Sequence, residues 1–351
     1  MAAASPDRYC VSSEEGSLQI NISSLTAQGR RMLSAMAEAG VREDFARTHV
    51  TTLVRGAAVG AIGIEPPTFR QLFESLGQIW GTYHYDHYLD LFGIDALVGK
   101  RFYNLGSGGF RHPIWTNVDY KSAHYSGTHI DIHWDAENMP VDAPSGQAGA
   151  VYTSHTIEHL QNKGAANLFN EAYRLLQSGG VFRVTCPEFE YYYEGVQSVD
   201  RYRYSSQIPQ GFDSAADAVI ANFLAETASQ VSPVFKDAWA GTAAMKAVEL
   251  AGLSVPDPVS PNEFRQMIDT KGRDEAILEI TRRVDIGVHQ HMLGGHVNFW
   301  PYNRIAEFGR QAGFQTIYRS AYGQSRCPIF QDTRYFDTTV PHISVYVEMV
   351  K

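Results

Sequence analysis

Short β-type runs alternate with helical patterns from residue 101 onward, and this alternation constrains the fold more than any other feature. The runs that favour strands are RFYNLG (101–106), TNVDY (116–120), HIDIHW (129–134), AVYTSH (150–155) and VFRVTCP (181–187). Between the last two, KGAANLFNEAYRLLQSGG places its apolar residues on one helical face, and Gly179-Gly180 is expected to end that helix. This strand–helix–strand rhythm predicts an α/β fold with a doubly wound, mainly parallel sheet.

The alternation stops near residue 190 and resumes near residue 300, so the sheet domain is predicted to be split. Residues 99–190 and 297–351 are expected to form the α/β domain, the second part contributing the helix PYNRIAEFGRQAGF and the strands QTIYRSAYG and HISVYVEMV. Residues 191–296 are expected to be a mainly helical insertion that acts as a lid over the ligand edge of the sheet. Residues 1–98 are expected to be a helical N-terminal region, from the apolar spacing in LTAQGRRMLSAMAEAG and TFRQLFESLGQIW.

The charge and cysteine content narrow the class of protein. With 29 basic and 38 acidic side chains the net charge is −9, and no basic run is present, which argues against a nucleic-acid partner. No stretch approaches the ~18 consecutive apolar residues of a membrane span, and no basic segment with an apolar run opens the chain. The 3 cysteines fit neither a disulfide framework nor a CxxC metal site. We expect a soluble cytoplasmic protein with no membrane partner.

A glycine turn and two acidic residues follow successive predicted strands. The turn NLGSGG (104–109) closes the first strand, but Arg111 occupies the place of the third glycine of a dinucleotide fingerprint. Asp119 ends the second strand and Asp135 follows the third. Each could merely cap a turn. In this order and on this scaffold, however, they favour a ligand crevice in which Asp119 accepts hydrogen bonds from the hydroxyls of a ribose.

Two histidine-containing segments raise the question of a metal ion. SHTIEHL (154–160) contains H-x-x-E-H, the spacing of an inverted zinc-peptidase motif, but a strand runs directly into it, so His155 and His159 need not share a helical face. VHQHMLGGHVNFW places His289, His291 and His296 at the end of the insertion. These three could hold a metal ion or form a loop without function, but lining of a ligand pocket is favoured. We expect no metal ion.

The segments YNLGSGG, NVDY, DAENMP, AVYTSHTIEHL and LFNEAYRLLQSGGVFRVTCPE together resemble the class I S-adenosylmethionine-dependent methyltransferases, in particular the subgroup with an SHxxEH segment after the fourth strand. The similarity covers roughly residues 100–190 and resumes from HVNFWPYNRIAEFGRQAGF to the end. It implies a Rossmann-like sheet of seven strands, the last antiparallel, and S-adenosylmethionine as cofactor. The cofactor-binding residues that it implies are Asn104, Gly106, Ser107, Gly108, Asp119, Tyr120, Asp135, Ala136, Ser154 and His155.

The resemblance leaves the methyl acceptor open, and the insertion matches no known segment. We expect in-line methyl transfer, under the lid, to a small hydroxyl- or amine-bearing metabolite such as a sugar or a secondary-metabolite intermediate. A histidine is the expected base because imidazole accepts protons near neutral pH. The candidate catalytic residues are His155, His296, His291 and Glu188, the last in a CPE segment where relatives often show Val-Pro-Asp. The candidate substrate-binding residues are Tyr191, Tyr192, His289, His291 and His296, the two tyrosines being equally suited to a core.

Other functions remain open at this point. A non-catalytic binding or scaffold module could keep the same fold, and a zinc hydrolase could use the HxxEH segment. A protein or RNA acceptor is less favoured, RNA because of the acidic balance. A homodimer through the N-terminal region is a further expectation.

Overall fold

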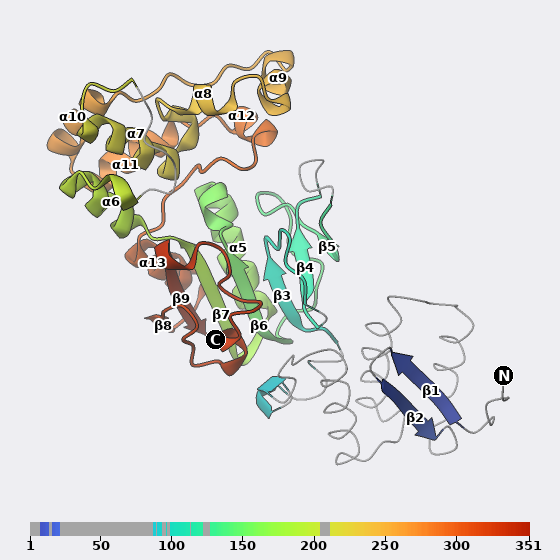
Figure 1. Ribbon diagram of the computed structural model, residues 1–351. Helices are drawn as coiled ribbons and strands as arrows, with labels where there is room; N and C mark the ends of the chain where they lie inside the picture. Colours follow the sequence, from blue (N-terminus) through green and yellow to red (C-terminus); the bar gives the residue numbers. More distant parts are fainter. Residues whose placement is uncertain are drawn as a thin grey trace.

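The computed structural model describes residues 8–13, 16–21, 87–88, 90–92, 96, 99–112, 114–121, 127–203 and 211–351 (Figure 1). Within the predicted helical N-terminal region, two strands, β1 (Arg8–Ser13) and β2 (Gly16–Asn21), pair antiparallel where no strand was expected. The two segments predicted to be helical, LTAQGRRMLSAMAEAG and TFRQLFESLGQIW, lie outside the described residues.

A seven-stranded mixed sheet forms the centre of the described chain, with strand order β5-β4-β3-β6-β7-β9-β8. Neighbouring strands from β5 to β7 pair in parallel, whereas β9 is antiparallel to both β7 and β8. The predicted seven-stranded sheet with an antiparallel last strand is therefore confirmed. The strands are β3 (Phe102–Leu105), β4 (Thr116–Asp119), β5 (Ile132–His133), β6 (Ala148–Ser154), β7 (Leu176–Pro187), β8 (Thr316–Arg319) and β9 (Ser344–Val350).

One face of the sheet is covered by α5 (Asn162–Leu175) and α13 (Tyr302–Ala312), which contact each other and the strands beneath them. Residues of α5 at helical spacing, including Leu168, Phe169 and Ala172, are fully buried against the sheet. The helix ends at Leu175, before the glycine stop that the sequence predicted, because β7 begins at Leu176 and pairs with Ala148 before a register shift. Gly179 instead lies within this irregular start of β7, where its left-handed backbone (φ 78) is one that glycine adopts easily.

The opposite face is covered by the segment that leads into β9. Aromatic rings of this segment pack on the sheet, Phe336 lying 5.1 Å from Trp115 and 5.2 Å from Tyr152 between ring centroids. Arg183 of β7, fully buried, pairs with Asp337 at 2.6 Å and with Glu348 of β9 at 2.5 Å. These ion pairs fix the segment on the sheet.

Seven α-helices occupy the described part of the predicted insertion and its borders. They are α6 (Phe189–Ser198), α7 (Ala215–Thr227), α8 (Phe235–Trp239), α9 (Ala243–Leu250), α10 (Pro261–Lys271), α11 (Arg273–Arg282) and α12 (Ile286–His291). Ser214 and Ser260 cap α7 and α10, each hydroxyl accepting a backbone N–H at 3.2 Å. Phe223, Phe264 and Ile277 belong to a separate apolar core of these helices. Figure 1 shows the helical group beyond the carboxyl ends of the strands.

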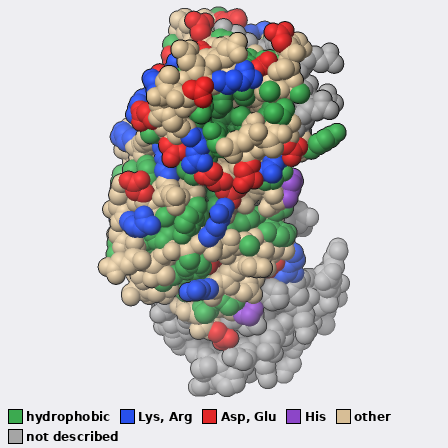
Figure 2. All heavy atoms as spheres, turned by 90° about the vertical axis from the view of Figure 1, so that its left-hand side faces the viewer, with side chains coloured by type: hydrophobic (Ala, Val, Ile, Leu, Met, Phe, Trp, Pro, Cys, Tyr) green, Lys and Arg blue, Asp and Glu red, His purple; other side chains and the backbone are tan. Residues whose placement is uncertain are grey.

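The surface over the helical group and α13 carries both signs of charge. Figure 2 shows acidic and basic side chains interspersed on this face, without a broad area of one sign. Several of these charges form ion pairs across short distances, for example Arg283 with Glu263 at 2.7 Å. Among the described residues, no helix combines the length and the apolar character that crossing a bilayer would need.

Candidate functional site

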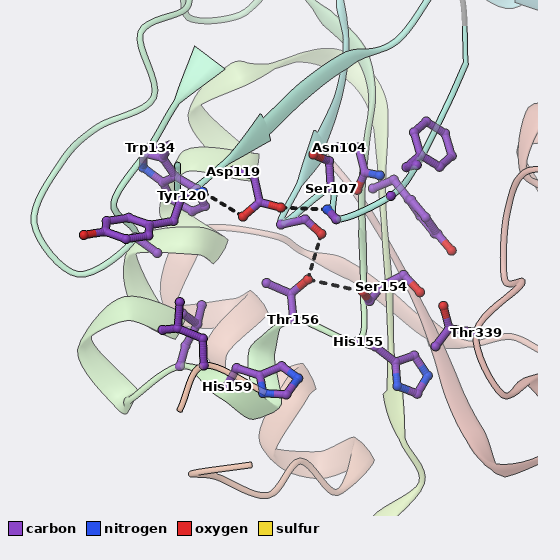
Figure 3. Close-up of a pocket in the computed structure, with 18 of the residues that line it drawn as sticks. Asn104, Ser107, Asp119, Tyr120, Trp134, Ser154, His155, Thr156, His159 and Thr339 are labelled. Carbon is purple, nitrogen blue, oxygen red and sulfur yellow. Dashed lines mark hydrogen bonds between the residues drawn. The ribbon is translucent and has the colours of Figure 1, made fainter. Parts of the chain in front are cut away.

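A cavity of about 880 Å³ lies at the carboxyl ends of β3, β4 and β6 (Figure 3). Its wall is built from the turns that follow these strands, from α12, and from the segment that precedes β9. The structure brings together in this wall all ten residues that the resemblance assigned to the cofactor: Asn104, Gly106, Ser107, Gly108, Asp119, Tyr120, Asp135, Ala136, Ser154 and His155.

The turn after β3 uses two glycines for different reasons. At Gly106 (φ 73) an added Cβ would lie 2.2 Å from Cγ2 of Thr156, so the turn packs directly against the SHTIEHL segment. At Gly108 (φ 48) an added Cβ would meet no atom within 4 Å. The backbone at Gly108 is therefore accessible to a ligand, in a conformation that glycine adopts without strain.

The carboxylate of Asp119 is held in place at the end of β4. Its Oδ2 accepts the backbone N–H of Gly108 at 2.6 Å, and its Oδ1 accepts the N–H of Tyr120 at 2.7 Å. Burial raises the pKa of Asp119 above its ordinary value, while these two hydrogen bonds act in the opposite direction. Each oxygen keeps a second lone pair, so the carboxylate can still accept hydrogen bonds from two hydroxyl groups in the cavity.

Asp135 is engaged in its own turn. Its Oδ1 accepts the N–H of Glu137 and its Oδ2 accepts the side-chain amide of Asn138, both at 2.9 Å. These hydrogen bonds are those of a residue that caps a turn, which was one of the two roles predicted for Asp135. Beside it, the buried Trp134 donates its indole N–H to the Met139 carbonyl at 2.8 Å and also lines the cavity.

Buried Nδ1 of His289, which lines the cavity, has no hydrogen-bond partner among the described residues, and neither do two buried side-chain oxygens of the cavity wall. The two oxygens are Oδ1 of Asn104 and Oγ of Ser107, in side chains that are 2% and 5% exposed. Buried polar atoms in native proteins are nearly always hydrogen-bonded. A polar ligand in the cavity is therefore the expected partner of these two oxygens.

His155 follows β6 in a left-handed backbone conformation (φ 50), which is uncommon outside glycine but is accessible to histidine. Its Nε2 lies 2.8 Å from Oγ of Ser344 and its Nδ1 lies 3.2 Å from Oε1 of Glu158. Burial alone would raise the pKa of Glu158, but the neighbouring imidazoles, His155 foremost, outweigh it and lower the value to about 2. The ring of His155 is thus held between a hydroxyl and a carboxylate at the cavity wall.

Of the three histidines predicted to line the ligand pocket, one belongs to the cavity wall. His289 lines the cavity, its Nε2 lying 3.0 Å from the His159 carbonyl, and burial lowers its pKa to about 4. His291 is exposed and is not part of the wall. His296 packs against His159, with 5.0 Å between ring centroids, outside the wall.

Three further predicted residues lie away from the cavity. The carboxylate of Glu188 pairs with Arg319 of β8. Tyr192 is buried in the core of the helical insertion, which was one of the two predicted alternatives for the tyrosines. The ring of Tyr191 lies under the guanidinium of Arg203, 4.8 Å from its carbon.

Several wall residues were not predicted from the sequence. They come from α12 and its end, from the turn after β6, and from the segment before β9, and include Thr156, His159, Gln161, Ile286, Gln290, Leu293, Arg334, Tyr335, Thr338 and Thr339. The run RYFDTT (334–339) combines aromatic, hydroxyl and basic side chains before the last strand. This composition was the signal in the sequence that the segment could contact a ligand. Its position in the wall depends on tertiary packing.

Comparisons with known proteins find no matching protein-family profile and no match among the curated proteins searched. Solved structures are matched at low similarity. A methyltransferase dependent on S-adenosylmethionine from Mesorhizobium loti is 13% identical, with a TM-score of 0.33, over 72% of this chain and 90% of that one. One from Archaeoglobus fulgidus is 10% identical, with a TM-score of 0.31, over 80% and 99%. Human N-acetylserotonin methyltransferase, solved with S-adenosylmethionine, is 12% identical, with a TM-score of 0.25, over 98% and 79%.

Proposed function

We propose that this chain is an S-adenosylmethionine-dependent methyltransferase. The observation that carries the proposal is the convergence, in one cavity at the carboxyl edge of the sheet, of an open glycine turn, the carboxylate of Asp119 and the unpartnered oxygens of Asn104 and Ser107. The strand order of the sheet and the sequence resemblance support the same assignment. When bound, S-adenosylmethionine supplies a methyl group activated on a sulfonium.

The chain's own residues have distinct roles in holding this cofactor. Asp119 accepts hydrogen bonds from the ribose hydroxyls, since its two oxygens are already fixed by backbone N–H groups. Asn104 and Ser107 bind the polar groups of the methionine part. The backbone at Gly108 leaves room for close approach. Asp135 and Ala136, together with Trp134, form the side of the cavity that receives the adenine.

The acceptor is proposed to be a small metabolite bearing a hydroxyl or amine group, such as a sugar or a secondary-metabolite intermediate. A volume of about 880 Å³ lies within the range of small-molecule sites. Ile286 and Leu293 supply apolar wall from the insertion, while His289 and Gln290 supply polar groups. The insertion then acts as a lid that excludes water and aligns the acceptor with the methyl group, because methyl transfer depends mainly on positioning.

His155 is the proposed base. Nδ1 lies 3.2 Å from the Glu158 carboxylate and Nε2 contacts the Ser344 hydroxyl; in the tautomer with the proton on Nδ1, Nε2 is the nitrogen that can take up a proton. The carboxylate of Glu158 stabilises the imidazolium that forms. His289, which also lines the cavity, is the next candidate, whereas His291, His296 and Glu188 lie outside the cavity wall.

Isothermal titration calorimetry with S-adenosylmethionine tests the cofactor assignment. The wild-type chain should bind, and Asp119→Ala should weaken binding by at least about tenfold, because charge-assisted hydrogen bonds are lost. Asp142→Ala removes an exposed aspartate outside the cavity and should bind like wild type. A folded wild-type chain that does not bind would favour the scaffold module. Unchanged affinity of Asp119→Ala would remove the central residue assignment.

Mass spectrometry of reactions with candidate acceptors tests the activity itself. Small hydroxylated and amine-bearing compounds should gain a methyl group, with S-adenosylhomocysteine as the coproduct. His155→Gln should retain cofactor binding but lose most of the turnover. A cytoplasmic location, the absence of nucleic-acid and membrane partners, and a homodimer through the N-terminal region stay predictions, and most of that region lies outside the described residues.

A further inference from the structure

A second cluster of ionisable side chains lies behind the cavity wall. It forms where the turn after β6 (Ile157–His159) meets the strip of residues 292–300, which leads back from the insertion to α13. Glu158, 2% exposed, is its centre. Neither carboxylate oxygen has a hydrogen-bond partner among the described residues, and the 3.2 Å contact of Oε1 with Nδ1 of His155 lacks hydrogen-bond alignment. A buried carboxylate with unused lone pairs needs a positively charged neighbour, since burial of an isolated charge is unfavourable.

Two imidazoles next to Glu158 have the tautomer that metal coordination requires. Nδ1 of His159 lies 3.0 Å from the Gly295 carbonyl, and Nδ1 of His296 lies 2.7 Å from the Glu226 carbonyl. A carbonyl oxygen only accepts hydrogen bonds, so Nδ1 carries the proton in both rings and each Nε2 has a free lone pair. Metal-binding histidines are typically oriented in this way, with the other ring N–H donated to a carbonyl or carboxylate.

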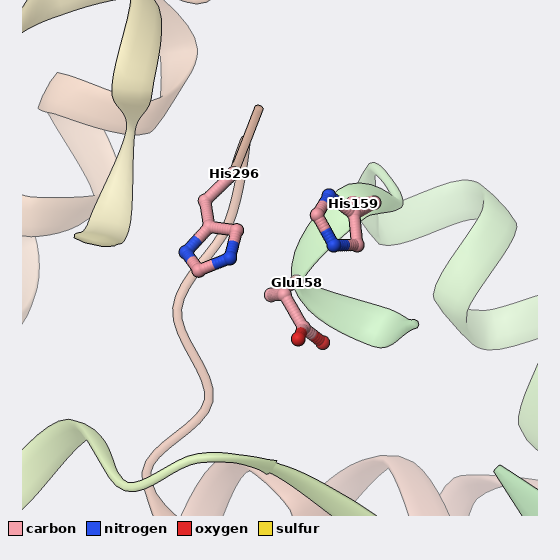
Figure 4. A group of neighbouring side chains, drawn as sticks. All are labelled: Glu158, His159 and His296. Atoms are coloured by element: carbon pink, nitrogen blue, oxygen red, sulfur yellow. The ribbon is translucent and has the colours of Figure 1, made fainter. Parts of the chain in front are cut away.

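The donor atoms of the three residues are close enough to share one ion. One carboxylate oxygen of Glu158 and one ring nitrogen each of His159 and His296 lie within 4.8 Å of one another. Figure 4 shows His296, on the strip from the insertion, across from His159 and Glu158 on the turn after β6. Bonds of about 2.0–2.2 Å to a tetrahedral ion would require these atoms to move closer by roughly 1 Å.

A small void adjoins Glu158, on a side that neither His159 nor His296 lines. It has a volume of about 10 Å³ and is lined by Glu158, Glu226, Thr227 and Asn298 and by apolar groups, including Phe299. This is about the space of one water molecule. The carboxyl group of Glu226 also lines this void, and its Oε2 lies 3.9 Å from Nδ1 of His296. Burial raises the pKa of Glu226 to about 7.

We propose that Glu158, His159 and His296 bind one divalent transition metal ion of the zinc type. Two imidazoles with one carboxylate form a ligand set of Zn²⁺ and of related first-row ions. The proposal replaces the sequence-based expectation of no metal ion, and its ligands differ from both sets considered there. His155 is not a ligand because its Nε2 contacts Ser344, and His291 is exposed.

The position of the ion gives it a structural role. Glu158 and His159 belong to the turn after β6, whereas His296 belongs to the strip that leads back from the helical insertion. The backbone N–H of Val297 already donates to the Glu158 carbonyl at 2.8 Å. A shared ion would tie the insertion to the wall of the cavity through His159, which lines it.

Calorimetric titration of the full chain with Zn²⁺, after removal of metal by chelation and dialysis, tests the site. The wild-type chain should bind one ion per chain and should gain thermal stability from it. His159→Ala and His296→Ala should each weaken binding by at least about a hundredfold, because each removes a direct ligand. His291→Ala, which removes an exposed histidine of the same segment, is the matched control and should bind like wild type.

His296→Gln, which keeps a polar side chain of similar length, provides a second variant if the alanine variant does not fold. A folded wild-type chain that binds no Zn²⁺ would overturn the proposal, as would binding that His159→Ala and His296→Gln leave unchanged. Titration with S-adenosylmethionine is carried out on the metal-free chain. The metal site and the proposed methyltransferase function can therefore fail independently of each other.

Discussion

The side chain of Thr156 occupies the space that a Cβ of Gly106 would need. Its Oγ1 also donates a hydrogen bond to the Gly106 carbonyl at 3.2 Å. The contact joins the glycine turn after β3 to the SHTIEHL segment after β6, although the two lie far apart in the sequence. The two most informative motifs of the sequence thus form one packed unit in the wall of the cavity.

Gly106→Ala should destabilise the fold by about 2–4 kcal/mol, because a left-handed backbone (φ 73) and a direct overlap with Thr156 both oppose the added methyl group. Urea denaturation measures the change. Gly109→Ala is the matched control, since its added Cβ meets no atom within 4 Å. Equal losses of stability in the two variants would contradict the role of this contact.

Gly108→Ala tests whether a ligand approaches the glycine turn, because it should affect the affinity for S-adenosylmethionine without creating a clash inside the protein. Its backbone (φ 48) is strained for alanine, which costs about 1–2 kcal/mol, but the added methyl group meets no protein atom. The affinity for S-adenosylmethionine should fall because the methyl group narrows the approach to the turn. Calorimetry at a temperature where the variant is folded measures this, and wild-type affinity would show that no ligand approaches Gly108.

Much of the fold could be predicted from the sequence because it rests on local patterns. The alternation of strands and helices and the positions of Gly106 and Asp119 depend on the β-type runs and on turn chemistry. The end of α5 was predicted too late, since pairing of Leu176 with Ala148 overrides the glycine signal that follows. Tertiary pairing of this kind leaves no local trace.

The candidate site was predictable only where it lies next to the strands. Residues directly after β3, β4 and β6 reach the cavity because parallel strands end at one edge. No comparable rule predicts which residues of the insertion reach the cavity. His289 lies in the wall whereas His291, two positions on, is exposed, because both belong to the short helix α12 and point to different sides. The closeness of His289 and His291 in the sequence therefore does not place both side chains in the cavity wall.

Asp337→Asn should destabilise the fold by about 1.5–3 kcal/mol, because the fully buried Arg183 loses charge-assisted hydrogen bonds to Asp337 and keeps one carboxylate partner, Glu348. Asparagine tolerates the left-handed backbone at this position (φ 59), so the variant isolates the charge. Urea denaturation gives the value. Glu275→Gln removes an exposed partner of Arg282 and should cost less than about 1 kcal/mol. Similar costs in the two variants would argue against the buried pair.

Acid should weaken the fold through His112. Burial lowers the pKa of this ring from 6.5 to about 3, among aromatic neighbours that include Tyr335 at 4.9 Å. Between these two values the unfolded chain binds a proton that the folded chain does not, so stability is full above pH 6.5 and falls as the pH decreases. From pH 7 to pH 5 this one group should contribute a loss of about 2 kcal/mol in the free energy of unfolding.

Urea denaturation at both pH values should show that His112→Phe lacks this part of the loss. His342→Phe, at an exposed histidine, should follow the wild-type profile. Parallel pH profiles for wild type and His112→Phe would mean that the ring is protonated equally in both states.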